Sequence, residues 1–207
     1  MELHTILKNV DNLDGPILDI GFGKGKFSDL MLNYILSNTI RPRKFIAFDT
    51  FNKYEGNTHP RWAIDFKNNA LNKANLETTI EFGLVDEHLE SVVRSAKPAI
   101  TFISLPELDL IKSALKKTFN KVNKGSIIIV DTKWGPEVKG QDTFDMFAIE
   151  KNSVLSLVEK FCTDNSSNYI VASKQNYAYI VKGDMFKSKL ASPVSNKIKR
   201  ERSVNLT

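Results

Sequence analysis

The sequence predicts an α/β protein in which helices wind around both faces of a seven-stranded, mostly parallel sheet that ends in an antiparallel strand pair. Five short apolar segments alternate with stretches in which apolar residues recur every three or four positions. Such alternation is typical of buried parallel strands connected by helices. Two further apolar segments, 169–172 and 178–181, are joined by a short polar stretch that suffices for an antiparallel hairpin but not for a parallel crossover.

The first strand is predicted at 17–20, where an apolar run is interrupted only by Asp19. A tight turn follows, and its glycines are Gly21, Gly23 and Gly25. Glycines allow positive φ and a close approach of the backbone to a ligand. The next helix presents one apolar face, formed by Phe27, Leu30, Met31, Tyr34 and Ile35. Open α/β sheets bind ligands in such a crevice between a strand end and a helix.

The remaining elements follow in order along the chain. Strands are predicted at 44–49, 79–82, 99–103 and 126–131. Helices are predicted at 3–10, 62–76, 108–122 and 141–163, the last with one break. Two of the strands end on an acidic residue, Asp49 and Asp131. Because the carboxyl ends of parallel strands meet at one edge, these acids are expected on the same side of the sheet as the glycine turn.

Composition limits the class of protein. Of the 207 residues, 42% are hydrophobic and 13 are phenylalanine, which is enough for a sizeable core. No apolar stretch approaches the roughly 20 residues of a membrane span, and the N-terminus does not resemble a signal peptide. The single cysteine, Cys162, rules out an internal disulfide and a cysteine-based zinc cluster. We therefore expect a cytoplasmic protein with no membrane partner.

The positive charge is concentrated at one end of the chain. The formal net charge is +5, and residues 184–207 hold six basic and two acidic side chains. The rest of the chain is therefore nearly neutral. We expect one folded domain at 1–183 and a basic, disordered tail at 184–207. The tail either keeps the protein soluble or contacts nucleic acid or another acidic surface.

The glycine turn does not match two common nucleotide-binding motifs. The dinucleotide fingerprint G-x-G-x-x-G would need a glycine where Lys26 stands, and the P-loop would need Ser or Thr where Phe27 stands. What remains, an acidic residue followed by x-G-x-G-x-G, resembles motif I of the class I S-adenosylmethionine-dependent methyltransferases, which have a Rossmann-like fold. The ammonium, carboxylate and sulfonium of that cofactor suit a glycine turn beside a carboxylate. The alternative is a turn that only closes a strand–helix unit.

Further cofactor contacts are expected from the next two strands. An acid at the end of the second strand, here Asp49, accepts hydrogen bonds from ribose hydroxyls in Rossmann-type sites, although it could also cap a helix. Leu84, after the third strand, lies where an adenine ring would be sandwiched, or it only anchors a loop. The full set of expected cofactor-binding residues is Asp19, Gly21, Phe22, Gly23, Gly25, Asp49, Thr50, Leu84 and Ser104.

A narrower resemblance emerges from four segments taken together: 47–51, 82–89, 103–105 and 124–131. In this order they resemble the macrocin O-methyltransferase family, and the likeness extends over roughly residues 15–182. The resemblance implies methylation of a hydroxyl on a sugar or other small molecule, often with a divalent metal such as Mg²⁺. The expected partner is thus a small-molecule or glycan acceptor.

The chain departs from this family at its acidic segments. The family has an acidic segment after the fourth strand and a pair of acids after the fifth. Here Asp131 matches the first acid of the pair and is the candidate metal ligand, but Thr132 replaces the second acid. Lys133 beside them would repel a cation. Only Glu107 or Asp109, with a shift in register, could replace the segment after the fourth strand.

A neutral sugar hydroxyl is a poor nucleophile and needs a base or a metal beside it. The candidate catalytic residues are Asp131, Glu107, Asp109 and His59. His59 precedes Pro60 in a polar loop and could equally be solvated. Two other functions remain open, namely a cofactor-binding homologue without catalysis and a nucleic-acid methyltransferase. The near-neutral body and the absence of a proline pair and an aromatic residue after the fourth strand argue against nucleic acid.

Overall fold

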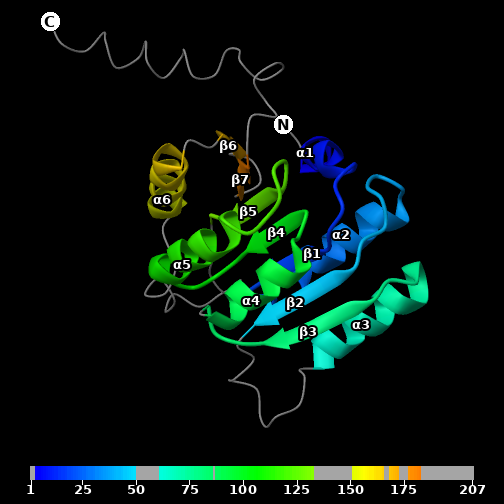
Figure 1. The fold of residues 1–207 in the computed structure, drawn as a ribbon. Coiled ribbons are helices and arrows are strands. Elements are labelled where there is room, and N and C mark those ends of the chain that lie inside the picture. The colour runs from blue at the N-terminus through cyan, green and yellow to red at the C-terminus, as the bar shows by residue number, and fades with distance from the viewer. Residues whose placement is uncertain are drawn as a thin grey trace, which may run out of the picture.

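The computed structural model describes residues 3–49, 61–85, 87–132, 151–165, 168–172 and 177–182, and every structural statement below concerns these residues. They form one sheet covered by helices on both faces (Figure 1). Its strands are β1 (Ile17–Ile20), β2 (Phe45–Asp49), β3 (Thr78–Phe82), β4 (Ile100–Ile103), β5 (Ile127–Asp131), β6 (Asn168–Ala172) and β7 (Tyr177–Val181).

The seven-stranded sheet has the order β3-β2-β1-β4-β5-β7-β6. The strands β1 to β5 pair in parallel, whereas β7 runs antiparallel to both of its neighbours, β5 and β6. The predicted α/β class and the antiparallel C-terminal pair are therefore confirmed. The order reverses between β1 and β4, because the chain first builds outward through β2 and β3 and then returns. Doubly wound sheets bind their ligands at this switch point, which here lies beside the glycine turn.

The helices divide between the two faces of the sheet (Figure 1). Those on one face are α1 (Leu3–Leu7), the 3₁₀ helix η1 (Lys8–Val10), α2 (Lys26–Leu36) and α3 (Arg61–Ala74). Those on the other are α4 (Glu87–Ala96), α5 (Leu108–Phe119) and α6 (Lys151–Asp164). Strand residues alternate accordingly: Ile17 and Ile129 pack toward the α2 face, and Leu18 and Ile128 pack toward the α5 face.

One helix had no predicted bounds. Five strand–helix units were expected, but no residues were assigned to the helix between the third and fourth strands, where α4 lies. Its buried residues Leu89, Val92 and Val93 follow helical spacing and pack on the α5 face. Helix α4 therefore forms the crossover from β3, at the edge of the sheet, to β4, at its centre.

Aromatic packing fixes the helix that follows the glycine turn. The ring of Phe27 on α2 stacks on the ring of Phe102 on β4, with centroids 4.0 Å apart. Phe66 on α3 makes edge contacts with Phe22 and Phe45. Burying one phenylalanine side chain contributes roughly 1.5–3 kcal/mol, so these contacts hold α2 and α3 firmly against the sheet. The start of α2, where the turn ends, is thereby fixed relative to β1 and β4.

Several expected features lie outside the described residues. These are the loop that holds Thr50 and His59, residues 133–150 with the first part of the helix predicted at 141–163, and the tail at 184–207. In the described part of the chain, no helix combines the length and the apolar character that crossing a membrane requires.

Candidate active site

The glycine turn is fixed to the strands on either side of it. The backbone N–H groups of Gly21 and Phe22 both donate to the carbonyl of Phe48 on β2, at 2.9 and 3.3 Å. On the other side, the N–H of Ser104 after β4 donates to the carbonyl of Ile20, at 2.9 Å. The turn therefore occupies a defined position between β2 and β4, at the switch point of the sheet.

The three glycines of the turn have different surroundings, although all have positive φ: +79° for Gly21, +51° for Gly23 and +74° for Gly25. A Cβ at Gly21 would lie 2.0 Å from the carbonyl oxygen of Ser104, and one at Gly25 would lie 2.7 Å from the ring of Phe22. A Cβ at Gly23 would meet nothing closer than 3.8 Å. Packing thus requires glycine at Gly21 and Gly25, whereas Gly23 borders open space in which a ligand can approach the backbone.

Asp19 is an almost fully buried carboxylate behind this turn, with 2% of its surface exposed. Its Oδ2 accepts a hydrogen bond from the Ser28 hydroxyl on α2, at 2.6 Å, while its buried Oδ1 has no hydrogen-bond partner among the described residues. Burial, with a smaller contribution from the nearby charge of Asp49, raises the pKa of Asp19 to about 7. A buried acceptor without a donor is costly, so this oxygen suits a positively charged donor supplied by a ligand.

The raised pKa of Asp19 predicts a pH-dependent stability. Between about pH 4 and pH 7 the folded protein retains a proton on Asp19 that the unfolded chain has released. The stabilisation that results is complete at low pH and is lost as the pH rises through about 7. Asp19→Asn keeps an acceptor for Ser28 but cannot ionise. We expect its free energy of unfolding, relative to the unmutated protein, to increase with pH across this window.

Urea denaturation of both proteins at several pH values measures this difference. Groups that do not interact with Asp19 titrate equally in the two proteins, so their contributions cancel. A difference that stays constant from about pH 4 to about pH 8 would contradict the assignment.

Asp49 and Leu84 lie at the same edge of the sheet, at the ends of β2 and β3. The Oδ2 of Asp49 accepts a hydrogen bond from the N–H of Gly23, at 2.8 Å, so the second predicted acid is bonded to the turn itself. Leu84 follows β3 and is 58% exposed, an unusual degree for a leucine. Both predicted positions therefore border the surface beside the glycine turn.

Ser104 and Asp131 are brought together by the pairing of β4 with β5. Ile103 and Val130 are partners in this ladder, and the next residues, Ser104 and Asp131, project toward the α2 face. The Ser104 hydroxyl donates to Oδ2 of Asp131, at 3.2 Å. Ser104 thus connects the backbone beside the glycine turn with the acid at the end of β5.

Tyr177 is a site residue that sequence analysis missed. It opens β7 directly opposite Asp131, and its ring contacts Phe102 edge-on. Burial, and to a lesser extent the charges of Asp131 and Asp19, raise the pKa of Tyr177. No local pattern places Tyr177 beside Asp131, because this position depends on the register of an antiparallel pair more than forty residues apart.

The other described catalytic candidates are less closely associated with Asp131 than Ser104 and Tyr177 are. Glu107 immediately precedes α5 and Asp109 lies in its first turn, and both are exposed. Within the described residues, neither forms a hydrogen bond or ion pair with Asp131. The described part of the chain also contains no group of three or more His, Cys, Asp or Glu side chains arranged to hold a metal ion. Asp131 is therefore the best-placed acid described at this edge.

No protein-family model and no curated protein matches the sequence. Three solved structures with similar folds are informative. CalS11, a TDP-rhamnose 3′-O-methyltransferase of calicheamicin biosynthesis, has 16% identity and a TM-score of 0.59, over 87% of this chain and 76% of that chain. An rRNA methylase from Streptococcus thermophilus has 15% identity and a TM-score of 0.52, over 87% and 94%.

The third structure is SMU.1697c from Streptococcus mutans, solved in complex with SAH. It has 13% identity and a TM-score of 0.51, over 87% of this chain and 95% of that chain. At these identities the likeness establishes the fold. The arrangement of strands and helices is that of methyltransferases, as the resemblance of the first turn to motif I predicts.

Proposed function

We propose that the protein is an S-adenosylmethionine-dependent methyltransferase that acts on a hydroxyl of a sugar or another small molecule. The main observation behind this proposal is the edge of the sheet at the switch point. There, a glycine turn with open space at Gly23 lies beside an unpartnered oxygen of Asp19, and Asp131 ends β5 at the same edge.

The residues of the turn fit the methionine part of the cofactor. The ammonium group could donate to Oδ1 of Asp19, which accepts no hydrogen bond from any described residue, and its charge would favour the ionised carboxylate. The open side of Gly23 leaves room for the cofactor backbone. Asp49 and Leu84 border the adjoining surface, where a ribose and an adenine ring would follow. SAH, present in one protein of similar fold, is the demethylated form of this cofactor.

The bound cofactor would supply an electrophilic methyl group, so the protein must align the acceptor and remove its proton. Asp131 is positioned to take the proton of the acceptor hydroxyl while that oxygen gains the methyl group. The hydrogen bond from Ser104 fixes the orientation of the Asp131 carboxylate. Tyr177, opposite Asp131, would border the acceptor. A sugar acceptor is supported by the family resemblance and by the similar fold of a TDP-rhamnose methyltransferase.

Two alternatives have specific observations in their favour. Thr132, a buried residue, stands where the resembled family has its second acid, which favours a homologue that binds the cofactor without catalysis. The rRNA methylase of similar fold is matched over almost its whole length, which favours an RNA substrate. The near-neutral charge of residues 1–183 weighs against the second alternative.

Calorimetric titration with S-adenosylmethionine, followed by assay of radiolabelled methyl transfer, separates these functions. The acceptor panel should include nucleotide sugars, glycosides and total RNA. Saturable binding with transfer to a sugar is the expected result. Binding without transfer to any acceptor would support the non-catalytic homologue, transfer only to RNA would support the second alternative, and absence of binding would refute the proposal.

A further inference from the structure

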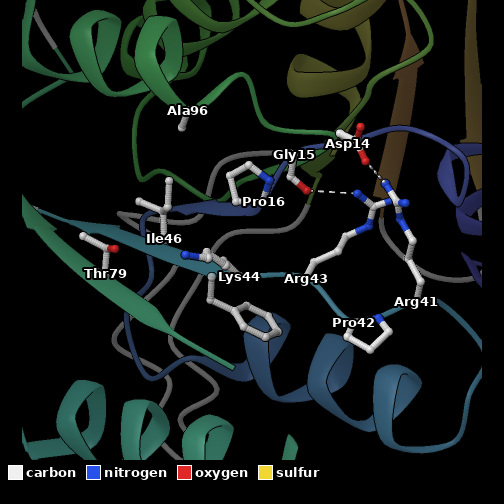
Figure 2. A pocket seen from close by; sticks show the side chains of 11 residues that line it. Asp14, Gly15, Pro16, Arg41, Pro42, Arg43, Lys44, Ile46, Thr79 and Ala96 are labelled. Carbon is white, nitrogen blue, oxygen red and sulfur yellow. Dashed lines mark hydrogen bonds and ion pairs between the residues drawn. The ribbon is translucent and has the colours of Figure 1, made fainter. Parts of the chain in front are cut away.

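Two charged side chains in the described part of the chain are almost fully buried, Asp19 and Arg43. Arg43 lines a cavity of about 510 Å³ at the edge of the sheet where β1, β2 and β3 begin (Figure 2). Its guanidinium donates to backbone carbonyls of residues 10–15, at 2.6–3.4 Å, and the charges of Asp11 and Asp14 favour its charged form. The fold itself therefore supplies partners and opposite charge to Arg43.

Asp19, at the carboxyl edge of the sheet, lacks such compensation. The Ser28 hydroxyl donates to its Oδ2, and its Oδ1 accepts no hydrogen bond from any described residue. No lysine, arginine or histidine among the described residues forms an ion pair with it. The lysines of the glycine turn, Lys24 and Lys26, are both exposed. A buried carboxylate with one hydrogen bond and no counter-ion is costly in its charged form.

The titratable groups that face Asp19 from the neighbouring strands are acids. Asp49 ends β2 on the same face of the sheet as Asp19, because Asp19 pairs with Ala47 in the β1–β2 ladder. Tyr177 opens β7 opposite Asp131, and its titration is affected by the charges of Asp131 and Asp19. Helix α2 contributes the uncharged Ser28 hydroxyl. No positive charge from these elements therefore offsets an ionised Asp19.

We propose that Asp19 releases its proton to solvent when S-adenosylmethionine binds, so that cofactor binding and proton release are coupled. This inference rests on the proposed function, because the ammonium group concerned is that of the cofactor. The O–H bond of the Asp19 carboxyl breaks and its proton passes to water. The ammonium keeps its own protons and pairs with the carboxylate that is formed. It thereby supplies the donor and the counter-ion that the described residues do not provide.

The coupling predicts that cofactor affinity rises with pH, because a protonated Asp19 opposes binding. With the pKa of Asp19 at about 7 in the free protein, Kd should fall about fivefold between pH 6 and pH 7. Over this range the cofactor ammonium stays mostly protonated, since α-amino groups have a pKa of about 7.7–8.0. At pH 6, roughly 0.9 protons should be released for each cofactor bound.

Calorimetric titration of the full chain in two buffers that differ in ionisation enthalpy counts the released protons without relying on catalysis. Asp19→Asn should bind the cofactor with a Kd that is constant between pH 6 and pH 7, and should release no proton. Ser28→Ala removes a hydroxyl that stabilises the ionised carboxylate, so proton release at pH 7 should be larger than in the unmutated protein. Asp65→Asn removes an exposed carboxylate from α3 and serves as the matched control, with unmutated behaviour expected.

5′-Methylthioadenosine, which keeps the nucleoside and the sulfur but lacks the ammonium, identifies the group that displaces the proton. Its binding should release no proton at pH 6. Equal proton release with this ligand, or with the cofactor in Asp19→Asn, would overturn the inference. Binding of S-adenosylmethionine without proton release at pH 6 would also overturn it, while the proposed function would stand. A protein that does not bind S-adenosylmethionine at any pH would refute the proposed function and this inference together.

Discussion

Asp131→Asn should reduce the rate of methyl transfer at least about a hundredfold, since loss of general-base assistance alone costs roughly 10²–10⁴-fold. Asparagine retains an oxygen that can accept the hydrogen bond of Ser104, so the local structure should persist. An amide cannot take the proton of an acceptor hydroxyl. We therefore expect an unchanged Tm and an unchanged affinity for S-adenosylmethionine, with the whole loss in kcat. Radiolabelled transfer, thermal unfolding and calorimetry measure the three quantities.

Asp109→Asn is the matched control, because it removes an exposed carboxylate from the same edge of the sheet. Its turnover should be nearly that of the unmutated protein. Near-normal turnover in Asp131→Asn would contradict the assignment. A large loss in Asp109→Asn would then assign the base to Asp109, and normal turnover in both variants would leave Glu107 and His59. If Asp131 had only a structural, capping role, Asp131→Asn would keep normal turnover and lose no more than a few tenths of a kcal/mol of stability, because asparagine caps about as well as aspartate.

Gly23→Val should abolish binding of S-adenosylmethionine, with Kd raised at least about a hundredfold, or some 2.7 kcal/mol. The valine side chain would enter the open space at Gly23, where the methionine part of the cofactor is proposed to lie. The fold should survive, because no described residue other than the direct chain neighbours lies closer than 3.8 Å to the new Cβ. The positive φ of +51° adds a backbone cost of about 1–2 kcal/mol. Calorimetry and circular dichroism distinguish lost binding from lost structure.

Gly23→Ala separates backbone strain from occupied volume. Alanine carries a similar penalty at positive φ but adds only one carbon. It should lower Tm through this backbone penalty, but it should weaken the binding of the cofactor much less than valine does. Unaltered affinity in a folded Gly23→Val protein would falsify the placement of the cofactor at this turn.

Much of the fold was predictable because each strand carries its own local signal. Apolar runs bounded by turn residues predicted the position of every strand to within a residue or two, and the acids Asp49 and Asp131 end β2 and β5 as expected. Helix α4 was given no bounds because its first turn lies within 82–89, a segment that was interpreted only through its family resemblance. Its three buried residues, Leu89, Val92 and Val93, supplied a helical period that was short and easily overlooked.

The site was predictable only where neighbours in sequence are neighbours in space. The glycine turn met that condition. The open space at Gly23 could not be told from the crowded surroundings of the other two glycines, because the crowding comes from the Ser104 carbonyl and the Phe22 ring. Tyr177 could not be placed beside Asp131 without the β5–β7 register. Arg43 gave no sign of burial, since carbonyls from a preceding loop hold its guanidinium.

The insertion of β7 between β5 and β6 affects how the chain must emerge from the ribosome. Until β7 is synthesised, one edge of β5 lacks its partner, and that strand is the apolar run Ile127–Asp131. At roughly 5–20 residues per second, the roughly 50 residues that separate the two strands take about 3–10 seconds to translate. During this interval the nascent chain exposes an unpaired β-edge of the kind that associates with other chains. The last strand of the sheet therefore also ends the period in which a newly made chain is most prone to aggregate.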